Sequence, residues 1–152
     1  MIGQWIDESP TALVLTSYHW ADEGRTIVSE FRIQVGGRPT MTGTQRIGWD
    51  PLAKKLHSWV FDSEGGVAEG VWTRNGNQWI IKMSGVTHEG ETASSTNVIT
   101  MKTKDRMTWQ SRDRVVGDET KPNVEEIAIV REPPKPNKST TGGHTASKGE
   151  TP

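Results

Sequence analysis

Two acidic side chains in the middle of the chain have the residue types and spacing that acid–base catalysis needs. Asp62 and Glu69 lie on either side of Glu64-Gly65-Gly66, and a two-residue loop formed by the glycines would place both carboxyl groups side by side across a β-hairpin. Like charges at that distance raise the pKa of one carboxyl group, which suits proton transfer. Two solvated acids near a hairpin tip, with Arg46 or Arg74 nearby, explain the same residues more simply.

Other candidate chemical groups are isolated from one another. Asp113 stands in the strand-like run R-D-R, where a solvated basic face is a simpler interpretation than an anion clamp. The histidines lack the spacing of a metal site, and the serines lack a G-x-S-x-G context. We therefore expect no metal and no cofactor. We assign no catalytic residue either, and keep Asp62, Glu69 and Asp113 as the candidates for an enzymatic alternative.

The stretch from Ser58 to Arg74 predicts the hairpin that would hold the acidic pair. Runs rich in Trp, Phe and Val flank the paired glycines. With a loop of two or four residues, Trp59, Phe61 and Trp72 share one face, and Asp62 and Glu69 share the other. Large rings opposite small residues indicate a crowded, curved interior.

The rest of the chain predicts further strands, because apolar and polar residues alternate between short turns. The segments are 3–6, 13–20, 26–35, 40–49, 79–85, 92–103, 107–114 and 124–131. About ten strands joined by short hairpins favour an all-β, antiparallel up-and-down barrel over a two-sheet sandwich. We expect this barrel to occupy residues 1–132. Residues 133–152 are rich in Pro, Lys, Ser, Thr and Gly and predict a disordered tail.

Composition limits the classes of partner. The chain has 152 residues, 18 Lys plus Arg against 19 Asp plus Glu, seven Trp and no Cys. The charges are interspersed, so we expect neither a nucleic-acid partner nor a membrane partner. The N-terminus has no basic stretch followed by an apolar run. We expect a cytoplasmic protein as the sequence stands, and export as part of a longer precursor stays open.

Two resemblances follow from particular residues. Gly3-x-Trp5 on a first strand and Arg131 at the end of a last strand resemble the calycin superfamily of lipocalins and fatty-acid-binding proteins. The resemblance implies that Trp5 closes the barrel floor and that Arg131 stacks across it as a cation–π pair. The segments 43–51, 58–66 and 108–114 resemble an uncharacterised module that follows a SnoaL-like domain in planctomycete-type bacterial proteins. This second resemblance implies no activity, but it makes a SnoaL-like domain a candidate partner.

The predicted inward face suggests a binding site for a small hydrophobic molecule. An apolar wall with a few convergent polar groups is typical of small-molecule sites, although a filled barrel with mutually satisfied polar groups is the alternative. Binding of an apolar or amphipathic ligand is our first hypothesis. An isomerase or cyclase that uses the carboxylates, and an accessory module for a SnoaL-like domain, are the others. The predicted lumen residues are Phe31, Gln45, Trp59, Phe61, Trp72, Met83, Asn97, Trp109, Ser111 and Asp113.

Overall fold

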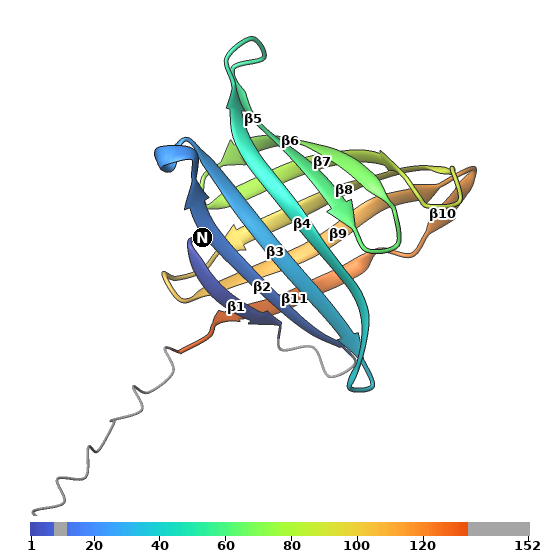
Figure 1. Cartoon of the computed structure of the whole chain (residues 1–152), viewed down its shortest axis with the longest axis horizontal. Helices are drawn as coiled ribbons and strands as arrows, with labels where there is room; N and C mark the ends of the chain where they lie inside the picture. The colour runs from blue at the N-terminus through green and yellow to red at the C-terminus, as the bar shows by residue number, and fades with distance from the viewer. Residues whose placement is uncertain (8–11, 134–152) are drawn as a thin grey trace, which may run out of the picture.

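A computed structural model describes residues 1–7 and 12–133 of the chain. Figure 1 shows an all-β molecule with one short 3-10 turn, η1 (Asp22–Gly24). The strands are β1 (Gly3–Asp7), β2 (Ala12–Ala21), β3 (Thr26–Val35), β4 (Arg38–Asp50), β5 (Lys55–Asp62), β6 (Val67–Asn75), β7 (Gln78–Val86), β8 (Thr92–Met101), β9 (Arg106–Val116), β10 (Glu119–Lys121) and β11 (Val124–Arg131).

The strands form a closed barrel with up-and-down topology. Each strand from β1 to β9 pairs antiparallel with the next one, β9 also pairs with β11, and β11 pairs with β1. The short β10 extends β9 beyond the ring. The predicted ten-stranded antiparallel barrel is therefore confirmed. The predicted break at Ser9-Pro10 and residues 134–152 of the predicted tail lie outside the described residues. No helix in the described part of the chain is long and apolar enough to span a bilayer.

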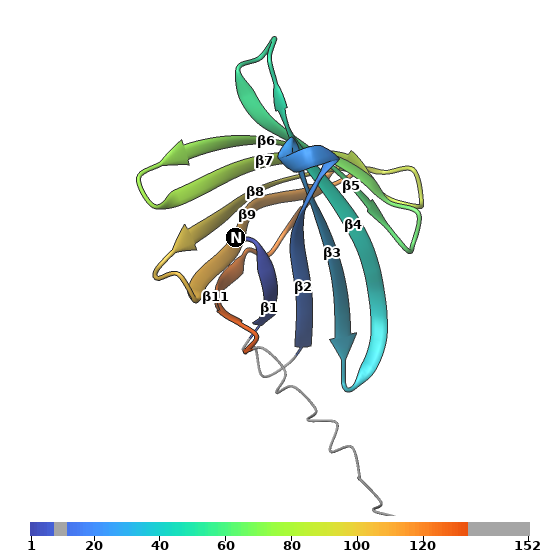
Figure 2. The same ribbon diagram turned by 60° about the vertical axis from the view of Figure 1, so that its left-hand side comes forward.

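The barrel has two different ends. One end, which we call the closed end, carries the N-terminus and the turns at 22–25, 51–54, 76–77 and 102–105. The far end carries the turns at 36–37, 63–66, 87–91 and 117–118. Figures 1 and 2 show that the β4–β5 hairpin projects beyond the closed end.

One arginine joins the last strand to both the first residues and a distant turn. The Arg131 guanidinium lies over the ring of Trp5, 4.4 Å from its centroid, so the stacking that the calycin resemblance implies is present. Arg131 also donates hydrogen bonds to the Ile2 carbonyl at 2.7 Å, to the Lys104 carbonyl at 3.0 Å and to Asp105 at 2.9 Å. These contacts close the barrel floor.

Gly3 makes room for this arginine. The φ angle of Gly3 is 122°, and a Cβ atom built there would lie 2.2 Å from Arg131 Nη1. Any other residue would therefore be strained in its backbone and would collide with the guanidinium. Trp5 is 1% exposed, and its Nε1 donates to the Met1 carbonyl. The G-x-W pattern thus has a direct steric explanation.

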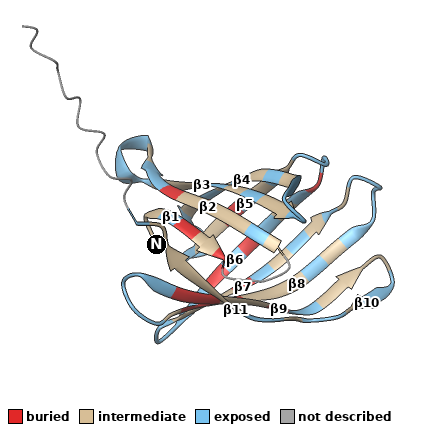
Figure 3. Cartoon of the chain, turned by 90° about the horizontal axis from the view of Figure 1, so that it is seen from below, coloured by how far each residue is buried: buried red, intermediate tan, exposed pale blue. Residues whose placement is uncertain are grey.

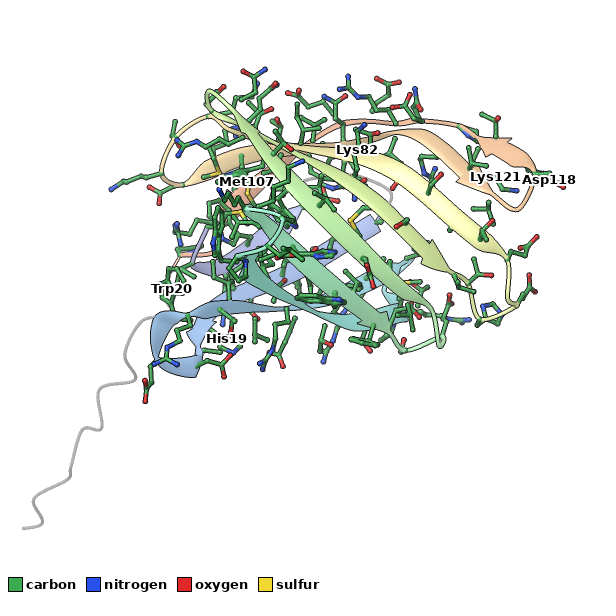
Figure 4. The ribbon with its side chains drawn as sticks, turned by 90° about the horizontal axis from the view of Figure 1, so that it is seen from above. His19, Trp20, Lys82, Met107, Asp118 and Lys121 are labelled. Atoms are coloured by element: carbon green, nitrogen blue, oxygen red, sulfur yellow. The ribbon has the colours of Figure 1, made fainter. Side chains whose placement is uncertain are left out.

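The packed core occupies the closed end. Buried residues gather near the N-terminus, whereas the strand ends around β10 carry mostly exposed and half-buried residues (Figure 3). Side chains are crowded around Met107, while Lys82 projects from the outer surface (Figure 4). The core residues are Trp5, Tyr18, Ile47, Trp72, Ile81, Ile99 and Met107. The far half of the barrel is therefore less densely filled.

Replacement of Arg131 by methionine should destabilise the fold. We expect the free energy of unfolding to fall by about 2–4 kcal/mol, because the variant loses the cation–π contact and several charge-assisted hydrogen bonds. Urea denaturation followed by circular dichroism measures this. Arg112→Met removes an exposed arginine and should change the free energy by less than about 0.5 kcal/mol. Equal stabilities of the two variants would contradict the role given to Arg131.

Candidate ligand-binding lumen

Inside the barrel, a partly open, mainly apolar cavity of about 480 Å³ lies between the packed core and the far end. Strands β1 to β9 and β11 each contribute inward-facing side chains to it. The lining residues are Asp7, Ala12, Val14, Thr16, Tyr18, Ser29, Phe31, Ile33, Gln45, Val60, Trp72, Ile81, Met83, Asn97, Ile99, Trp109, Ile127 and Ile129. A cavity of this size and composition suits a small organic ligand.

A second hollow of about 500 Å³ continues from the cavity to the far end. Val60, Met83 and Asn97 line both spaces, so they mark the junction between them. The hollow is more polar than the cavity, because the turns at 63–66 and 87–91 contribute charged side chains. The lumen thus changes from apolar to charged along its axis.

One wall of the cavity is fixed by a satisfied polar network. The Ser58 side chain is completely buried, and its hydroxyl oxygen accepts hydrogen bonds from Trp72 Nε1 at 2.9 Å and from Gln45 Nε2 at 3.2 Å. The indole of Trp72 is therefore held in one orientation between the core and the cavity. A buried indole N–H needs such a partner.

The adjoining strands β1 to β3 carry a buried phenol and a buried acid, and Ser29 on β3 pairs directly with Gln45 on β4. Tyr18 hydrogen-bonds the side chain of Ser29, and both residues line the cavity. Burial raises the pKa of Tyr18 above its usual value, and the hydrogen bond with Ser29 opposes this only in part. The phenol is therefore uncharged at neutral pH. Asp7 is 7% exposed and is the one acid among the described lining residues.

Asn97 differs from the other polar groups of the lumen. Its Oδ1 is buried and is the one buried side-chain oxygen or nitrogen without a hydrogen-bond partner in the described residues. Its cross-strand neighbours are Ile81 on β7 and Ser111 on β9. An unsatisfied buried carbonyl costs free energy unless something binds to it.

The predicted inward face of the β5–β6 hairpin is wrong on β5. Asp62 N donates to the Gly66 carbonyl, which leaves a loop of three residues, Ser63 to Gly65. Gly65 has a φ angle of 96°, as the last position of such a loop requires. An odd loop length shifts the pairing by one residue relative to loops of two or four, and every side chain of β5 changes face relative to β6.

The register shows the consequence for the aromatic residues. Trp72 pairs with Leu56, and Gly70 pairs with Ser58, so Ser58 and Val60 face the lumen with Trp72. Trp59 and Phe61 instead lie on the outer face and are 38% and 54% exposed. They are therefore not lumen residues.

The outer face of this hairpin is unusually apolar. Trp59 stacks on His57 with ring centroids 4.7 Å apart, and His57 Nε2 lies 3.4 Å from Glu69 Oε2. Phe61 pairs with Val67, which in turn pairs with Val86 on β7. We call the set of Trp59, Phe61, Val67, Val71 and Val86 the outer patch; each member is at least 38% exposed. Exposed apolar patches of this kind often mark interaction surfaces.

The predicted carboxylate pair does not form. The Asp62 carboxylate accepts hydrogen bonds from the backbone N–H groups of Glu64 and Gly66, both at 2.9 Å. It therefore organises the hairpin turn. Glu69 pairs with Trp59 on the outer face, where it approaches His57. Asp62 and Glu69 thus lie on opposite faces of the sheet and cannot act together on one substrate.

Asp113 and Ser111 are displaced from their predicted roles in different ways. The β8–β9 pairing shifts between Ser94 and Thr96, opposite Asp113. Asp113 has a left-handed φ of 53°, is exposed, and its N–H donates to Asn123 Oδ1. This bulge turns Asp113 out of the alternating pattern. Ser111 is 4% exposed beside Asn97, but it is absent from the cavity lining.

The other predicted lumen residues lie where alternation places them. Phe31, Gln45, Trp72, Met83, Asn97 and Trp109 all line the cavity. The wall also contains Tyr18, Val60 and Asp7, which sequence reasoning did not select. A loop of two or four residues, which places Trp59 and Phe61 inside, places their neighbour Val60 on the outer face. The pattern D-S-E-G, with Asp first and Gly fourth, is the signal of a three-residue loop, which places Val60 inside.

The described residues contain no group of three or more His, Cys, Asp or Glu side chains that could hold a metal ion. Comparison of the sequence with protein-family models gives no match, and neither does comparison with curated proteins.

The single tyrosine allows a direct test of the lumen's polarity. At pH values below 10.0, the usual pKa of tyrosine, the phenol is neutral in both the folded and the unfolded chain, and Tyr18 makes its full contribution to stability. As the pH rises beyond that value the unfolded chain loses its phenolic proton first, so the free energy of unfolding should fall. We expect the phenolate absorbance to appear only above pH 10 and together with unfolding seen by circular dichroism.

Because the sequence contains one Tyr, this absorbance reports on Tyr18 alone. The Tyr18→Phe variant is the control and should lose less stability over the same alkaline range. A folded protein that titrates at the usual value would show that the phenol is hydrated rather than buried.

Proposed function

We propose that the barrel binds a small apolar or amphipathic molecule in its lumen, as a carrier or sensor. The observation that carries this proposal is the cavity of about 480 Å³ behind a packed floor. Apolar side chains supply most of its wall, and burial of a ligand's apolar surface against them is favourable by about 25 cal/mol per Å². The adjoining hollow at the far end gives room for a polar part of the ligand.

A calycin-like carrier is the type of protein that these features support best. The closed ten-stranded barrel and the Trp5–Arg131 contact across its floor are the supporting observations. The alternative function, an isomerase or cyclase, required Asp62 and Glu69 to act as a pair. The two residues lie on opposite faces of the sheet and do not form that pair. Binding without catalysis therefore remains the proposal.

A bulky side chain placed in the lumen should weaken ligand binding there. Val60 lines both the cavity and the far-end hollow, so Val60→Trp should weaken binding of the neutral dye Nile red by at least about tenfold. Dye fluorescence and quenching of the tryptophan emission measure the affinity. Val71→Trp on the outer face of the same hairpin is the matched control and should bind as the wild type does. Equal binding by both variants would place the dye outside the lumen.

The outer patch favours a second function, docking of another protein domain. Its aromatic and aliphatic side chains are exposed on β5, β6 and β7, with Glu69 between them. Aromatic residues are enriched where proteins meet. A SnoaL-like domain is the partner that the sequence resemblance suggests.

The double variant Trp59→Ser, Phe61→Ser tests this second function. We expect it to keep Nile red binding while it loses at least about tenfold in affinity for a SnoaL-like domain from the same genome, because central aromatic anchors dominate interface energies. Sedimentation of the mixed proteins measures the complex. If wild type and variant sediment alike with every such domain, the outer patch does not dock this partner.

A further inference from the structure

The apolar inner face of the barrel continues past the packed core at the closed end. Trp20 on β2 and Trp49 on β4 lie two residues beyond the core residues Tyr18 and Ile47. Alternation therefore places both indoles on the same side of the sheet as the core. Trp20 is 58% exposed and Trp49 is 59% exposed, so the described residues leave more than half of each uncovered. Figure 4 shows Trp20 at the opposite end of the molecule from Asp118.

The β4–β5 hairpin carries a third apolar side chain still further out. The hairpin projects beyond the closed end (Figures 1 and 2), and Leu52 in its turn is 93% exposed. Asp50 Oδ1 holds the turn by accepting hydrogen bonds from Leu52 N at 2.8 Å and from Ala53 N at 3.0 Å. The turn therefore presents Leu52 in a defined position. We call Trp20, Trp49 and Leu52 the apolar rim.

Three basic residues surround a hollow behind the projecting turn. The hollow has a volume of about 370 Å³, and Trp49 and Trp79 form part of its wall. Its lining contains no acidic residue and three basic ones, which we call the basic cluster: Lys54, Lys55 and Arg74. The Arg74 guanidinium lies 5.6 Å from the ring centroid of Trp79. Within the described residues, no member of the basic cluster forms an ion pair with an acidic side chain.

The fold separates charges between the two ends of the barrel. Each acidic residue in the closed-end turns forms an ion pair with an arginine; the pairs are Asp22–Arg46, Glu23–Arg25 and Asp105–Arg131. The far-end turns instead carry four acidic residues and no lysine or arginine; the acidic residues are Glu64, Glu89, Glu91 and Asp118. A negatively charged surface would therefore attract the closed end and repel the far end. The sequence does not show this separation, because the charges are interspersed along the chain.

This combination of groups fits the surface of a lipid bilayer. Tryptophan is enriched at the boundary between headgroups and acyl chains, because its ring is apolar and its N–H is polar. A leucine side chain can enter the acyl region, while lysine and arginine keep their charged ends at the lipid headgroups. Binding strengthens with both the buried apolar area and the attraction to anionic lipids. The closed end offers both contributions on one projecting surface.

We propose that the closed end docks on a membrane surface that contains anionic lipids. The apolar rim enters the interfacial region, and the basic cluster contacts the negatively charged headgroups. The far-end hollow then faces the solution. This inference departs from the expectation of no membrane partner, which rested on the order of charges along the chain. It goes beyond the proposed function and does not depend on ligand binding in the lumen.

The first test compares binding of the wild-type protein to two kinds of vesicle. One consists of phosphatidylcholine alone, and the other contains phosphatidylcholine and phosphatidylserine in a ratio of about 7:3. We expect at least about tenfold tighter binding to the anionic vesicles, measured by flotation, because each basic residue near such a surface adds about fivefold. Addition of about 0.5 M NaCl should remove most of this difference, because salt screens exposed charges.

The absence of cysteine from the sequence allows the insertion to be measured directly. The Leu52→Cys variant, labelled with the polarity-sensitive dye NBD, should show emission that shifts to the blue when anionic vesicles are added. Val35→Cys with the same label is the matched control, because Val35 is 50% exposed and lies beside a far-end turn. Its emission should not shift.

Two double variants separate the basic cluster from the total charge of the protein. Lys54→Gln with Lys55→Gln should weaken binding to the anionic vesicles by at least about tenfold. Lys82→Gln with Arg112→Gln removes the same charge from exposed positions on β7 and β9 and should bind as the wild type does. Equal losses in both double variants would show that overall charge, and not the closed end, attracts the membrane.

The wild-type measurements decide the inference without any variant. Failure to bind the anionic vesicles, or equal binding to both kinds of vesicle, would overturn it. A label at position 52 that stays in water on bound vesicles would overturn the insertion of the apolar rim. Without vesicle binding, a dimer that Leu52→Asp dissociates would assign this end to a second copy of the chain. Binding of a single-stranded oligonucleotide that is lost with Lys54 and Lys55 would assign it to nucleic acid.

Discussion

The closure of the barrel floor by Arg131 is the contact on which the rest of the structure depends. The guanidinium covers Trp5 and donates to carbonyl groups of the N-terminal residues and of the β8–β9 turn. A closed barrel must hold its first and last strands together, because otherwise both strands expose unpaired edges. Here β1 and β11 pair along their backbones, the Arg131 side chain adds contacts across that seam, and Gly3 provides the space for it. The floor also gives the apolar core a surface to pack on.

The position of the floor at one end determines where the cavity lies. The large side chains of Trp5, Trp72 and Met107 fill the closed end, whereas the middle of the barrel is lined from the sides alone. Ten strands enclose a wider ring than the side chains fill. The Ser58–Trp72 hydrogen bond holds the indole of Trp72, which belongs both to the core and to the cavity wall, in one orientation. The cavity is therefore a consequence of the barrel's width and of a core that is anchored below it.

Much of the architecture was predictable because a period of two is a strong signal in strands with one apolar face. The alternation in β3, β7 and β8 correctly placed Phe31, Met83 and Asn97 inside. Alternation does not predict the inward face where backbone geometry resets it. The three-residue loop that ends at Gly65 exchanges the inward and outward side chains of β5. The bulge at Asp113 interrupts the alternation of inward and outward side chains in β9. Residue type gives no indication that Trp59 and Phe61 face outward, because both are as apolar as core residues and yet lie on the outer face. The unpaired state of Asn97 was not predictable either, because it depends on which neighbours reach its carbonyl.

The polar groups of the lumen differ in whether the fold satisfies their hydrogen bonds. Ser58, Gln45 and Trp72 satisfy one another, so their hydrogen bonds stabilise the wall whether or not a ligand is present. Asn97 Oδ1 has no such partner in the described residues, but it is buried away from the surface of the lumen. The polar groups that satisfy one another therefore fix the shape of the cavity. Its apolar side chains supply the surface against which a ligand could be buried.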